Sequence, residues 1–318
     1  MTQFDVTTTT DDVLAGLTLS GKRILVTGTS SGLGLETARA LVAHGAAVVG
    51  AVRDLGRAEQ ASADVRAAAA TGGGRFSLIT LDLASLASVR AASDALVADG
   101  RPFDAVIANA AIMATPFGRT ADGFEMQFGT NHLGHFAFIN RLAPVIKDGG
   151  RVVVLSSAAH RFSDVDLDDP NFERTDYDAW IAYGRSKTAN ALFAVELDRR
   201  WKDRGIRAAS VHPGGAETGL KRSVSQEDMD ALVARINAVA KAETGAPAFK
   251  LKSIPQAAAT SVWAAVVADG ESIGGRYCED CNVAPLAHGD GVRKGVRDYA
   301  IDAETAKTLW LKSEALVS

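Results

Sequence analysis

The sequence has only two cysteines, Cys278 and Cys281, in a C-x-x-C arrangement. A zinc site would need two further ligands, and only His288 lies near them in the sequence. We therefore expect no metal and no disulfide, and interpret both cysteines as ordinary residues at the end of a late strand. The remaining histidines lack metal-like spacing and a nucleophile motif, so we interpret them as structural.

Long apolar runs and clustered positive charge are also missing. No segment approaches the roughly 18 apolar residues of a membrane-spanning helix. Residues 1–12 contain neither the basic nor the apolar region of a signal peptide. Lysine and arginine are scattered and the net charge is −4, which argues against a nucleic-acid-binding surface. We expect a cytoplasmic protein that binds neither membranes nor nucleic acid.

The chain also lacks a proline- or serine-rich linker and internal repeats. Its 318 residues, 47% of them hydrophobic, could form one large α/β domain or two small ones. Without a linker, we predict a single domain at residues 19–290, after an N-terminal extension (1–18) and before a C-terminal tail (291–318).

Short apolar runs alternate with helix-length stretches along this domain. The runs are nearly continuous, as in strands buried on both faces of a parallel sheet. The longer stretches each end at a glycine, the usual helix C-cap. This alternation predicts an α/β fold with a doubly wound, seven-stranded parallel sheet and helices on both faces. Predicted strands are 23–26, 47–52, 76–81, 105–108, 152–155, 208–211 and 276–278; predicted helices are 33–44, 85–98, 123–146 and 180–204.

Two segments interrupt the alternation. Residues 160–178 are acidic and loop-like, and residues 221–255 form a helical excursion between a strand and a helix. Ligands bind at the carboxyl edge of such sheets, so we expect both segments to lie over that edge, with 221–255 as a substrate lid.

A glycine-rich turn, T-G-T-S-S-G-L-G, follows the first predicted strand and opens a helix. Its first glycine permits a tight turn, its second a close approach to a pyrophosphate, and its third the packing of helix on strand. A diphosphate would lie against the amides of the first helical turn. The spacing is G-x-x-x-G-x-G rather than G-x-G-x-x-G. The expected contacts come from Thr27, Gly28, Ser30, Ser31, Gly32, Leu33 and Gly34.

The end of the second predicted strand bears on the type of dinucleotide. An acidic residue there would bind the ribose hydroxyls of NAD, but here Arg53 comes first, followed by Asp54. The guanidinium of an arginine can pair with a 2′-phosphate, so we predict NADP. NAD is the second choice, because Asp54 could turn inward.

Two further motifs follow the next two predicted strands. Asp82-Leu83 could hold the adenine, and Asn109 with Ala110 could brace the sheet. Either motif could instead cap a helix or turn.

Tyr183 and Lys187 lie four residues apart in a predicted helix, so both side chains emerge on one face. An ammonium beside a phenol favours the phenolate and lowers the pKa of the tyrosine. Such a tyrosine can donate and accept a proton near neutral pH. The pair Ser156-Ser157 follows a predicted strand, and alternation would send its two side chains to opposite faces.

Together, these motifs resemble the short-chain dehydrogenase/reductase family over residues 19–285. The chain is most similar to the retinol-dehydrogenase-like branch, as a soluble member of bacterial type. N-H-L-G-H-F, S-S-A-A-H-R and the long gap between Ser157 and Tyr183 are typical of that branch. The resemblance rests on Thr27–Gly34, Asp82-Leu83, Asn109–Ala111, Asn131 in N-H-L-G-H-F, Ser156-Ser157, Tyr183 with Lys187, and His212-Pro213-Gly214 leading to Thr218.

The sequence departs from the family in two places. The run Ala108–Ala111 reads A-N-A-A where the family usually has N-N-A-G, which leaves Asn109 as the only candidate for that role. The chain also lacks the hydrophobic anchor of the branch's membrane-bound retinoid enzymes, which argues against a retinoid substrate.

The resemblance implies a Rossmann fold and a role for each motif residue. Tyr183 would act as general acid/base, while Lys187 would lower its pKa and hold the nicotinamide ribose. Ser157, or Ser156 in the other register, would hydrogen-bond the substrate oxygen. Asn131 would anchor a water on the proton path. Pro213, Gly214 and Thr218 would bind the nicotinamide.

These roles predict an NADP-dependent alcohol dehydrogenase or carbonyl reductase for an apolar, aromatic or alicyclic small molecule. The pocket would be lined from residues 112–117, 161–180 and 221–251. The aromatic or alicyclic class is suggested by Phe117, Phe162, Trp180, Leu220 and Phe249. A nucleotide-sugar epimerase or dehydratase, and a non-catalytic NADP(H) sensor, are the alternatives. The family implies a homodimer or homotetramer through its long helices, unless the acidic loop and the C-terminal tail cover one of those faces.

Overall fold

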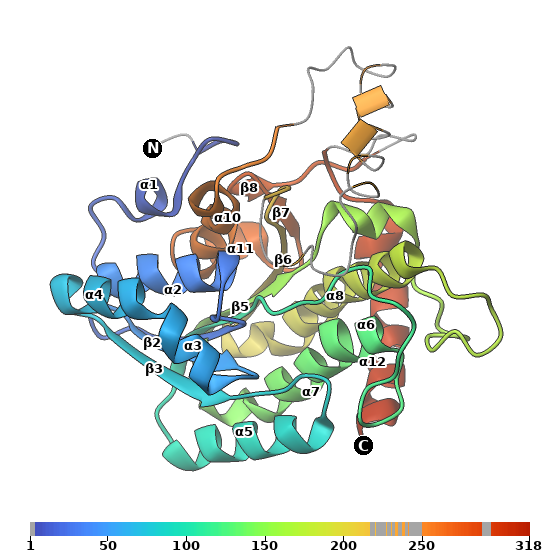
Figure 1. Cartoon of the computed structure of the whole chain (residues 1–318), viewed down its shortest axis with the longest axis horizontal. Helices are drawn as coiled ribbons and strands as arrows, with labels where there is room; N and C mark the ends of the chain where they lie inside the picture. The colour runs from blue at the N-terminus through green and yellow to red at the C-terminus, as the bar shows by residue number, and fades with distance from the viewer. Residues whose placement is uncertain are drawn as a thin grey trace.

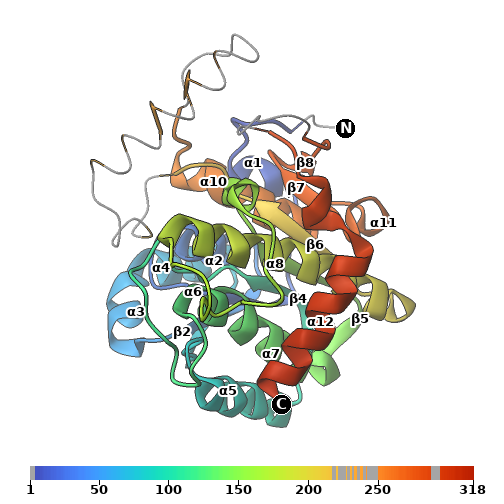
Figure 2. The same cartoon turned by 90° about the vertical axis from the view of Figure 1, so that its right-hand side faces the viewer.

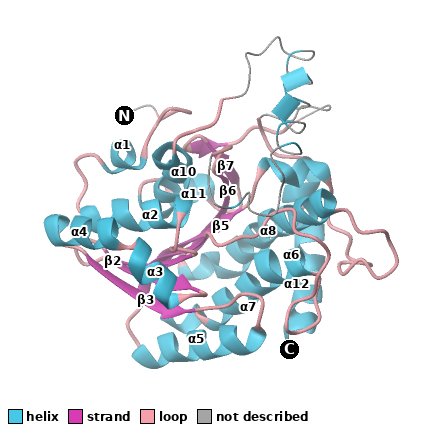
Figure 3. Cartoon of the chain, viewed as in Figure 1, coloured by secondary structure: helices cyan, strands magenta, loops and turns pink. Residues whose placement is uncertain are grey.

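The fold is seen in a computed structural model that describes residues 4–216, 250–287 and 294–318, together with residues 220, 227, 230, 233, 234, 237, 238 and 241. One eight-stranded sheet crosses the centre of the molecule, with helices on both sides (Figures 1 and 3). None of the helices in the described ranges is long and apolar enough to cross a membrane.

The strand order is β3-β2-β1-β4-β5-β6-β7-β8, with parallel pairing from β3 through β7. This confirms the predicted doubly wound sheet. The predicted count of seven omitted β8, a strand of only two residues that pairs antiparallel with β7. The strands are β1 (Arg23–Thr27), β2 (Ala47–Val52), β3 (Arg75–Thr80), β4 (Phe103–Ala108), β5 (Ile146–Leu155), β6 (Arg207–His212), β7 (Tyr277–Glu279) and β8 (Asn282–Val283).

The sheet buries apolar side chains on both faces. On β1, Ile24 and Val26 contact the core on one face, and Leu25 contacts the core on the other. Strand alternation explains this division, and it accounts for the continuous apolar runs in the sequence. One face is covered by α1 (Thr10–Leu14), α2 (Gly32–Ala43), α4 (Ala63–Gly72) and α10 (Ile254–Val266), and the other by α5 (Leu86–Asp99), α7 (Gly134–Arg141), α8 (Ala179–Trp201) and α12 (Ala303–Val317).

The helix predicted at residues 123–146 is wrong in its bounds. The structure has the short α6 (Met126–Phe128), a π-helix (Gly129–Leu133) and α7, and β5 already begins at Ile146. The glycine taken as the helix end, Gly149 at φ +78°, lies instead where the β4–β5 register shifts. A glycine at positive φ serves both helix caps and bulges, so the residue alone does not distinguish them.

Both ends of the described chain contact the domain. At the N-terminal end, Thr10 donates to Glu36 of α2 (2.5 Å) and Gln256 of α10 donates to the Thr7 carbonyl (3.1 Å). Near the C-terminus, α12 lies across α7 and α8 (Figure 2). Its Trp310 is buried, with its ring 4.9 Å from that of Phe136. The remaining described helices are α3 (Leu55–Ala61) and α11 (Gly270–Ile273).

Candidate active site

The predicted site residues that the structure describes gather at one edge of the sheet. Because parallel strands end at the same edge, the residues that follow β1, β4, β5 and β6 are brought together there. Gly28, Asn109, Ser156 and Pro213 are the first residues after these four strands.

The glycine-rich turn leaves the start of α2 open. The side chain of the N-cap residue Ser31 makes no capping hydrogen bond, whereas Ser85 of α5 and Asp178 of α8 cap their helices. The first-turn amides of α2 are thus not taken by a side-chain acceptor, and a helix N-terminus of this kind suits an anion.

The turn is also too close-packed for any side chain at its last glycine. A Cβ on Gly34 would lie 2.3 Å from the Gly28 carbonyl oxygen and 2.4 Å from Asn109 Nδ2. Gly28 itself has φ +77° and Gly32 has φ +58°, a region that favours glycine. The cradle therefore fits a diphosphate held by backbone amides, as dinucleotides require.

A chain of buried and partly buried hydrogen bonds supports this turn from behind. Asn109 Nδ2 donates to the Thr27 carbonyl (2.8 Å), and the Ala110 amide donates to Thr27 Oγ1 (2.9 Å). Thr27 Oγ1 is 3.0 Å from His135 Nε2, and His135 Nδ1 is 3.0 Å from the Asn131 carbonyl. A carbonyl only accepts, so Nδ1 carries the proton and Nε2 accepts from the threonine.

His135, which was interpreted from the sequence as structural, links the glycine-rich turn to Asn131. Burial lowers the pKa of His135 to about 4, so the ring is neutral at physiological pH. The side chain of Asn131, in the π-helix, accepts from the Ile112 amide after β4 and donates to Ser186 Oγ of α8 (3.0 Å). No local motif signals the histidine's link, because its partner Thr27 lies 108 residues away.

The residues after β2 and β3 lie near the same edge. Arg53 is exposed, whereas the Asp54 side chain caps α3 by accepting from the Arg57 amide (3.0 Å). Asp82 accepts from the Ala84 amide (2.9 Å), and Leu83 is buried.

The serine pair divides as strand alternation suggests. The buried Ser156 donates from Oγ to the Lys187 carbonyl of α8 (2.7 Å), which commits this hydroxyl to holding the helix. Ser157 caps the 3₁₀ turn Ala158–Phe162, and its hydroxyl also hydrogen-bonds Tyr183.

Tyr183 and Lys187 are both buried, and burial controls their protonation. Lys187 Nζ donates to the Leu155 carbonyl (3.0 Å) and lies 5.6 Å from the centre of the Tyr183 ring. Burial raises the pKa of Tyr183 to about 12, opposed by the Ser157 hydrogen bond. Burial also lowers the pKa of Lys187 to about 7. The expected lowering of the tyrosine pKa by Lys187 is not found; desolvation dominates and disfavours both charges.

The turn after β6 completes the described edge. His212 Nδ1 accepts from the amides of Ala158 (3.2 Å) and Gly214 (3.4 Å), which ties this turn to the serine loop.

Thr218, Phe249 and most of the predicted lid lie outside the described residues. Cys278 and Cys281 are free and buried. In the described ranges, no group of three or more His, Cys, Asp or Glu side chains could hold a metal ion.

The chain is similar to known proteins over most of its length. The family model for short chain dehydrogenases matches residues 22–229. The "Probable oxidoreductase" of Streptomyces lividans is 43% identical over 92% of this chain and 96% of its own. Retinol dehydrogenase 14 of Mus musculus is 36% identical over 94% of this chain and 86% of its own.

Solved structures share this fold. A crystal structure from Mycobacterium paratuberculosis is 34% identical and covers 96% of each chain, with a TM-score of 0.71. A short chain dehydrogenase from Burkholderia cenocepacia, solved in complex with NADP, is 26% identical with a TM-score of 0.63 and covers 83% of this chain and 97% of its own.

The chain belongs to the short-chain dehydrogenase/reductase family and has its Rossmann fold. Within the family it is retinol-dehydrogenase-like. It is accordingly an NAD(P)-dependent oxidoreductase.

Proposed function

We propose that this protein is an NADP(H)-dependent alcohol dehydrogenase or carbonyl reductase for an apolar, aromatic or alicyclic substrate. The observation that carries the proposal is the buried Tyr183 phenol, hydrogen-bonded to Ser157 and adjacent to Lys187. When bound, a nicotinamide dinucleotide supplies the hydride chemistry. The protein's own residues position the substrate oxygen and move its proton.

In carbonyl reduction, Tyr183 donates its proton to the substrate oxygen, and in alcohol oxidation it removes that proton. The raised pKa of about 12 keeps the phenol protonated, which is the form that donates in reduction, whereas oxidation requires the phenolate. Ser157 holds the substrate oxygen where negative charge develops. Lys187 holds the nicotinamide ribose, and Asn131 with His135 supports the proton path.

The Tyr183→Phe substitution tests this role. We expect kcat to fall by at least about 10²-fold, the scale of a general acid/base, while NADPH binds with unchanged Kd. Steady-state kinetics and fluorescence titration measure the two. Tyr299→Phe is the control, because its hydroxyl donates to the His160 carbonyl (2.7 Å) and has no proposed catalytic role. An unchanged kcat in Tyr183→Phe would contradict the role of Tyr183, whereas NADPH binding without any turnover by the unsubstituted protein would support the non-catalytic sensor.

The preference for NADP rests on Arg53 and Asp54. Asp54 is occupied as a helix cap, which disfavours the inward turn that NAD would require. No ion pair joins Arg53 to another described residue, so its guanidinium is available for a 2′-phosphate.

Substituting Arg53→Ala should weaken NADPH binding by about tenfold, or roughly 1.4 kcal/mol, and leave NADH binding unchanged. Arg101→Ala, an exposed arginine before β4 at the opposite edge, should change neither. Tighter binding of NADH than of NADPH by the unsubstituted protein would overturn the NADP assignment. The relative with bound NADP supports the use of this dinucleotide in the family.

The proposed substrate class rests on a row of aromatic rings beside Tyr183. The Trp180 ring is centred 6.5 Å from the Tyr183 ring, and the Phe162 ring is 6.0 Å from that of Trp180. Both are only partly buried, so they offer apolar surface close to the phenol. A panel of aromatic and alicyclic ketones, compared with short aliphatic ones, tests this class.

A further inference from the structure

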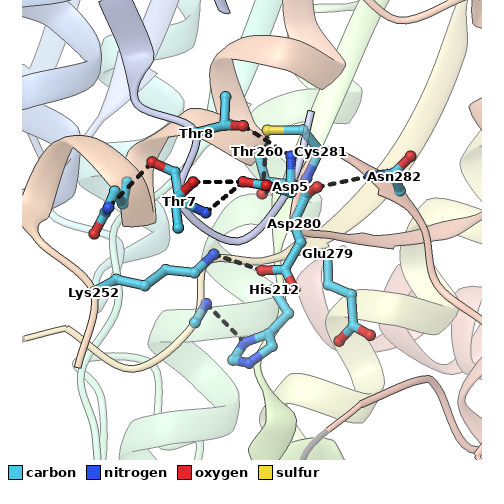
Figure 4. Close-up of polar contacts among 12 residues, drawn as sticks. Asp5, Thr7, Thr8, His212, Lys252, Thr260, Glu279, Asp280, Cys281 and Asn282 are labelled. Atoms are coloured by element: carbon cyan, nitrogen blue, oxygen red, sulfur yellow. Dashed lines mark hydrogen bonds and ion pairs between the residues drawn. The ribbon is translucent and has the colours of Figure 1, made fainter. Parts of the chain in front are cut away.

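Lys252 and Asp280 form a largely buried ion pair beside the turn that follows β6 (Figure 4). Lys252 Nζ lies 2.6 Å from Asp280 Oδ1, with 8% of the lysine side chain and 23% of the aspartate side chain exposed. Neither residue belongs to the motifs of the family resemblance. A pair so little exposed is screened much less than a surface pair, and breaking it leaves an uncompensated charge.

The lysine contacts the turn through both its backbone and its side chain. Its amide donates to the Gly215 carbonyl (2.8 Å), and Lys252 and Ala216 form a parallel bridge. Its stem crosses Gly214 so closely that a Cβ there would lie 2.8 Å from Lys252 Cδ and 2.9 Å from Cε. Gly214 has φ +88°, and its amide makes only a long hydrogen bond, 3.4 Å, to His212.

The aspartate is held in place by its own turn. Asp280 and Cys281 join β7 to β8 with φ +50° and +56°, both in the left-handed region that non-glycine residues seldom adopt. The Cys281 amide donates to Thr260 Oγ1 of α10 (3.2 Å). Asn282 Nδ2 donates to the Phe4 carbonyl (3.2 Å) and to the Asp280 carbonyl (2.9 Å). A conformation of this cost persists because its surroundings fix it.

We propose that Lys252, anchored by Asp280, is a positioning residue that fixes the Pro213-Gly214-Gly215 turn for binding the nicotinamide end of the cofactor. This inference rests on the proposed function of that turn. The β7–β8 turn fixes the carboxylate of Asp280, and the ion pair with this carboxylate fixes Lys252. The stem of Lys252 in turn confines Gly214, whose amide makes only a long hydrogen bond. Lys252 touches the turn and not the reacting atoms.

Removing either charge tests the proposal. Lys252→Met keeps most of the stem, and Asp280→Asn keeps the shape of the partner. We expect each substitution to raise the Kd for NADPH by about tenfold, within the usual range of coupling between sites. The double substitution should raise the Kd no further, because the two residues act as one unit. Lys252→Arg, which keeps a charge and a stem, should recover part of the affinity.

Arg207→Met provides the matched control. Arg207 starts β6, at the end opposite to His212, and pairs with Asp198 (2.9 Å) with 11% of its side chain exposed. Loss of this ion pair should lower the midpoint of thermal unfolding without changing the Kd for NADPH.

The outcomes separate this inference from the proposed function. If the unsubstituted protein binds neither NADPH nor NADH, the proposed function fails. If it binds NADPH and Asp280→Asn binds equally well while melting lower, the pair is only structural and the inference is overturned. Asp280→Asn decides the question if Lys252→Met does not fold.

Discussion

Lys187 illustrates how burial determines the chemistry of a single residue. Its ammonium donates a hydrogen bond to the Leu155 carbonyl, and only 2% of the residue is exposed. Neighbouring carboxylates do not contribute to its pKa, which desolvation alone lowers to about 7. A lysine of this kind changes charge near neutral pH, which suits a group that must stay close to a proton-transferring phenol.

Lys187→Met should change stability in a pH-dependent way. The pKa of Lys187 is about 7 in the folded protein, against an ordinary value of 10.5 in the unfolded chain. Between these values the unfolded chain binds more protons, so stability of the unsubstituted protein rises with pH across that window. Below pH 7 the fold must enclose the charged form. We therefore expect Lys187→Met to be relatively most stable below pH 7 and to lose this advantage towards pH 10.

Urea unfolding at several pH values between 6 and 10 measures the difference. The Leu155 carbonyl still accepts from Asn190 Nδ2 (2.9 Å) in the variant, so no buried acceptor is left unpaired. A stability difference that is constant over this pH range would contradict the assignment. Activity should be lost in the variant at every pH.

At the scale of elements, the β1–α2 unit shows why its glycines are required. The packing of α2 on β1 brings Gly34 against the Gly28 carbonyl, and the amides of the same helical turn are the proposed diphosphate site. Gly34 thus links the stability of the fold to the proposed binding of the cofactor.

Gly34→Ala should lower stability and abolish cofactor binding together. A methyl group 2.3 Å from a backbone oxygen forces α2 away from β1, at a cost of about 2 kcal/mol or more by analogy with overpacked cores. Gly56→Ala is the matched control, because the nearest atom to its Cβ is 3.6 Å away and it lies in α3. Thermal unfolding and NADPH titration compare the two; a Gly34→Ala protein that binds NADPH normally would contradict the turn's role.

Elements formed by local signals were predictable, and those that depend on distant partners were not. The strands that became β1, β2 and β4 were evident as apolar runs, and Gly28 to Gly34 as a turn motif. The π-helix at Gly129–Leu133 was not, since it is fixed by contacts such as Asn131 with Ile112. The two-residue β8 is too short for a periodic signal. His135 and Lys252 were missed because their partners, Thr27 and Asp280, are remote in the sequence.

At the scale of the whole molecule, α12 changes the outer surface of the long helices. Trp310 inserts between Phe136 of α7 and Phe193 of α8, and Ser313 Oγ is 2.8 Å from His132 Nε2. A dimer formed through α7 and α8 would therefore have to contact α12 as well. The region predicted as a C-terminal tail thus contains a helix that adds to the core.

Three buried histidines and the partly buried His212 should make the whole fold sensitive to acid. Burial lowers the pKa of His132 to about 3, of His135 to about 4 and of His160 to about 3, and it lowers that of His212 well below 6.5. In the unfolded chain these groups return to the ordinary histidine pKa of 6.5. Between about pH 4 and 6.5 the unfolded state binds more protons, so stability falls as the pH falls through this window.

Each such histidine contributes up to about 1.4 kcal/mol per pH unit, so four of them should make the loss steep below pH 6. Glu125 and Glu279 act in the opposite direction, because burial raises their pKa and the folded state takes up their protons first. These two groups therefore offset part of the loss.

Urea unfolding between pH 8 and 5 at constant ionic strength measures this slope. His132→Asn should reduce the slope of the unfolding free energy against pH by the contribution of one proton. The substitution removes one group that is neutral in the folded state and charged in the unfolded state. His44→Gln, at the half-buried C-terminal end of α2, is the matched control. Stability that stays flat from pH 8 to 5, or an equal slope in His132→Asn and the unsubstituted protein, would show that these rings are not held neutral by the fold.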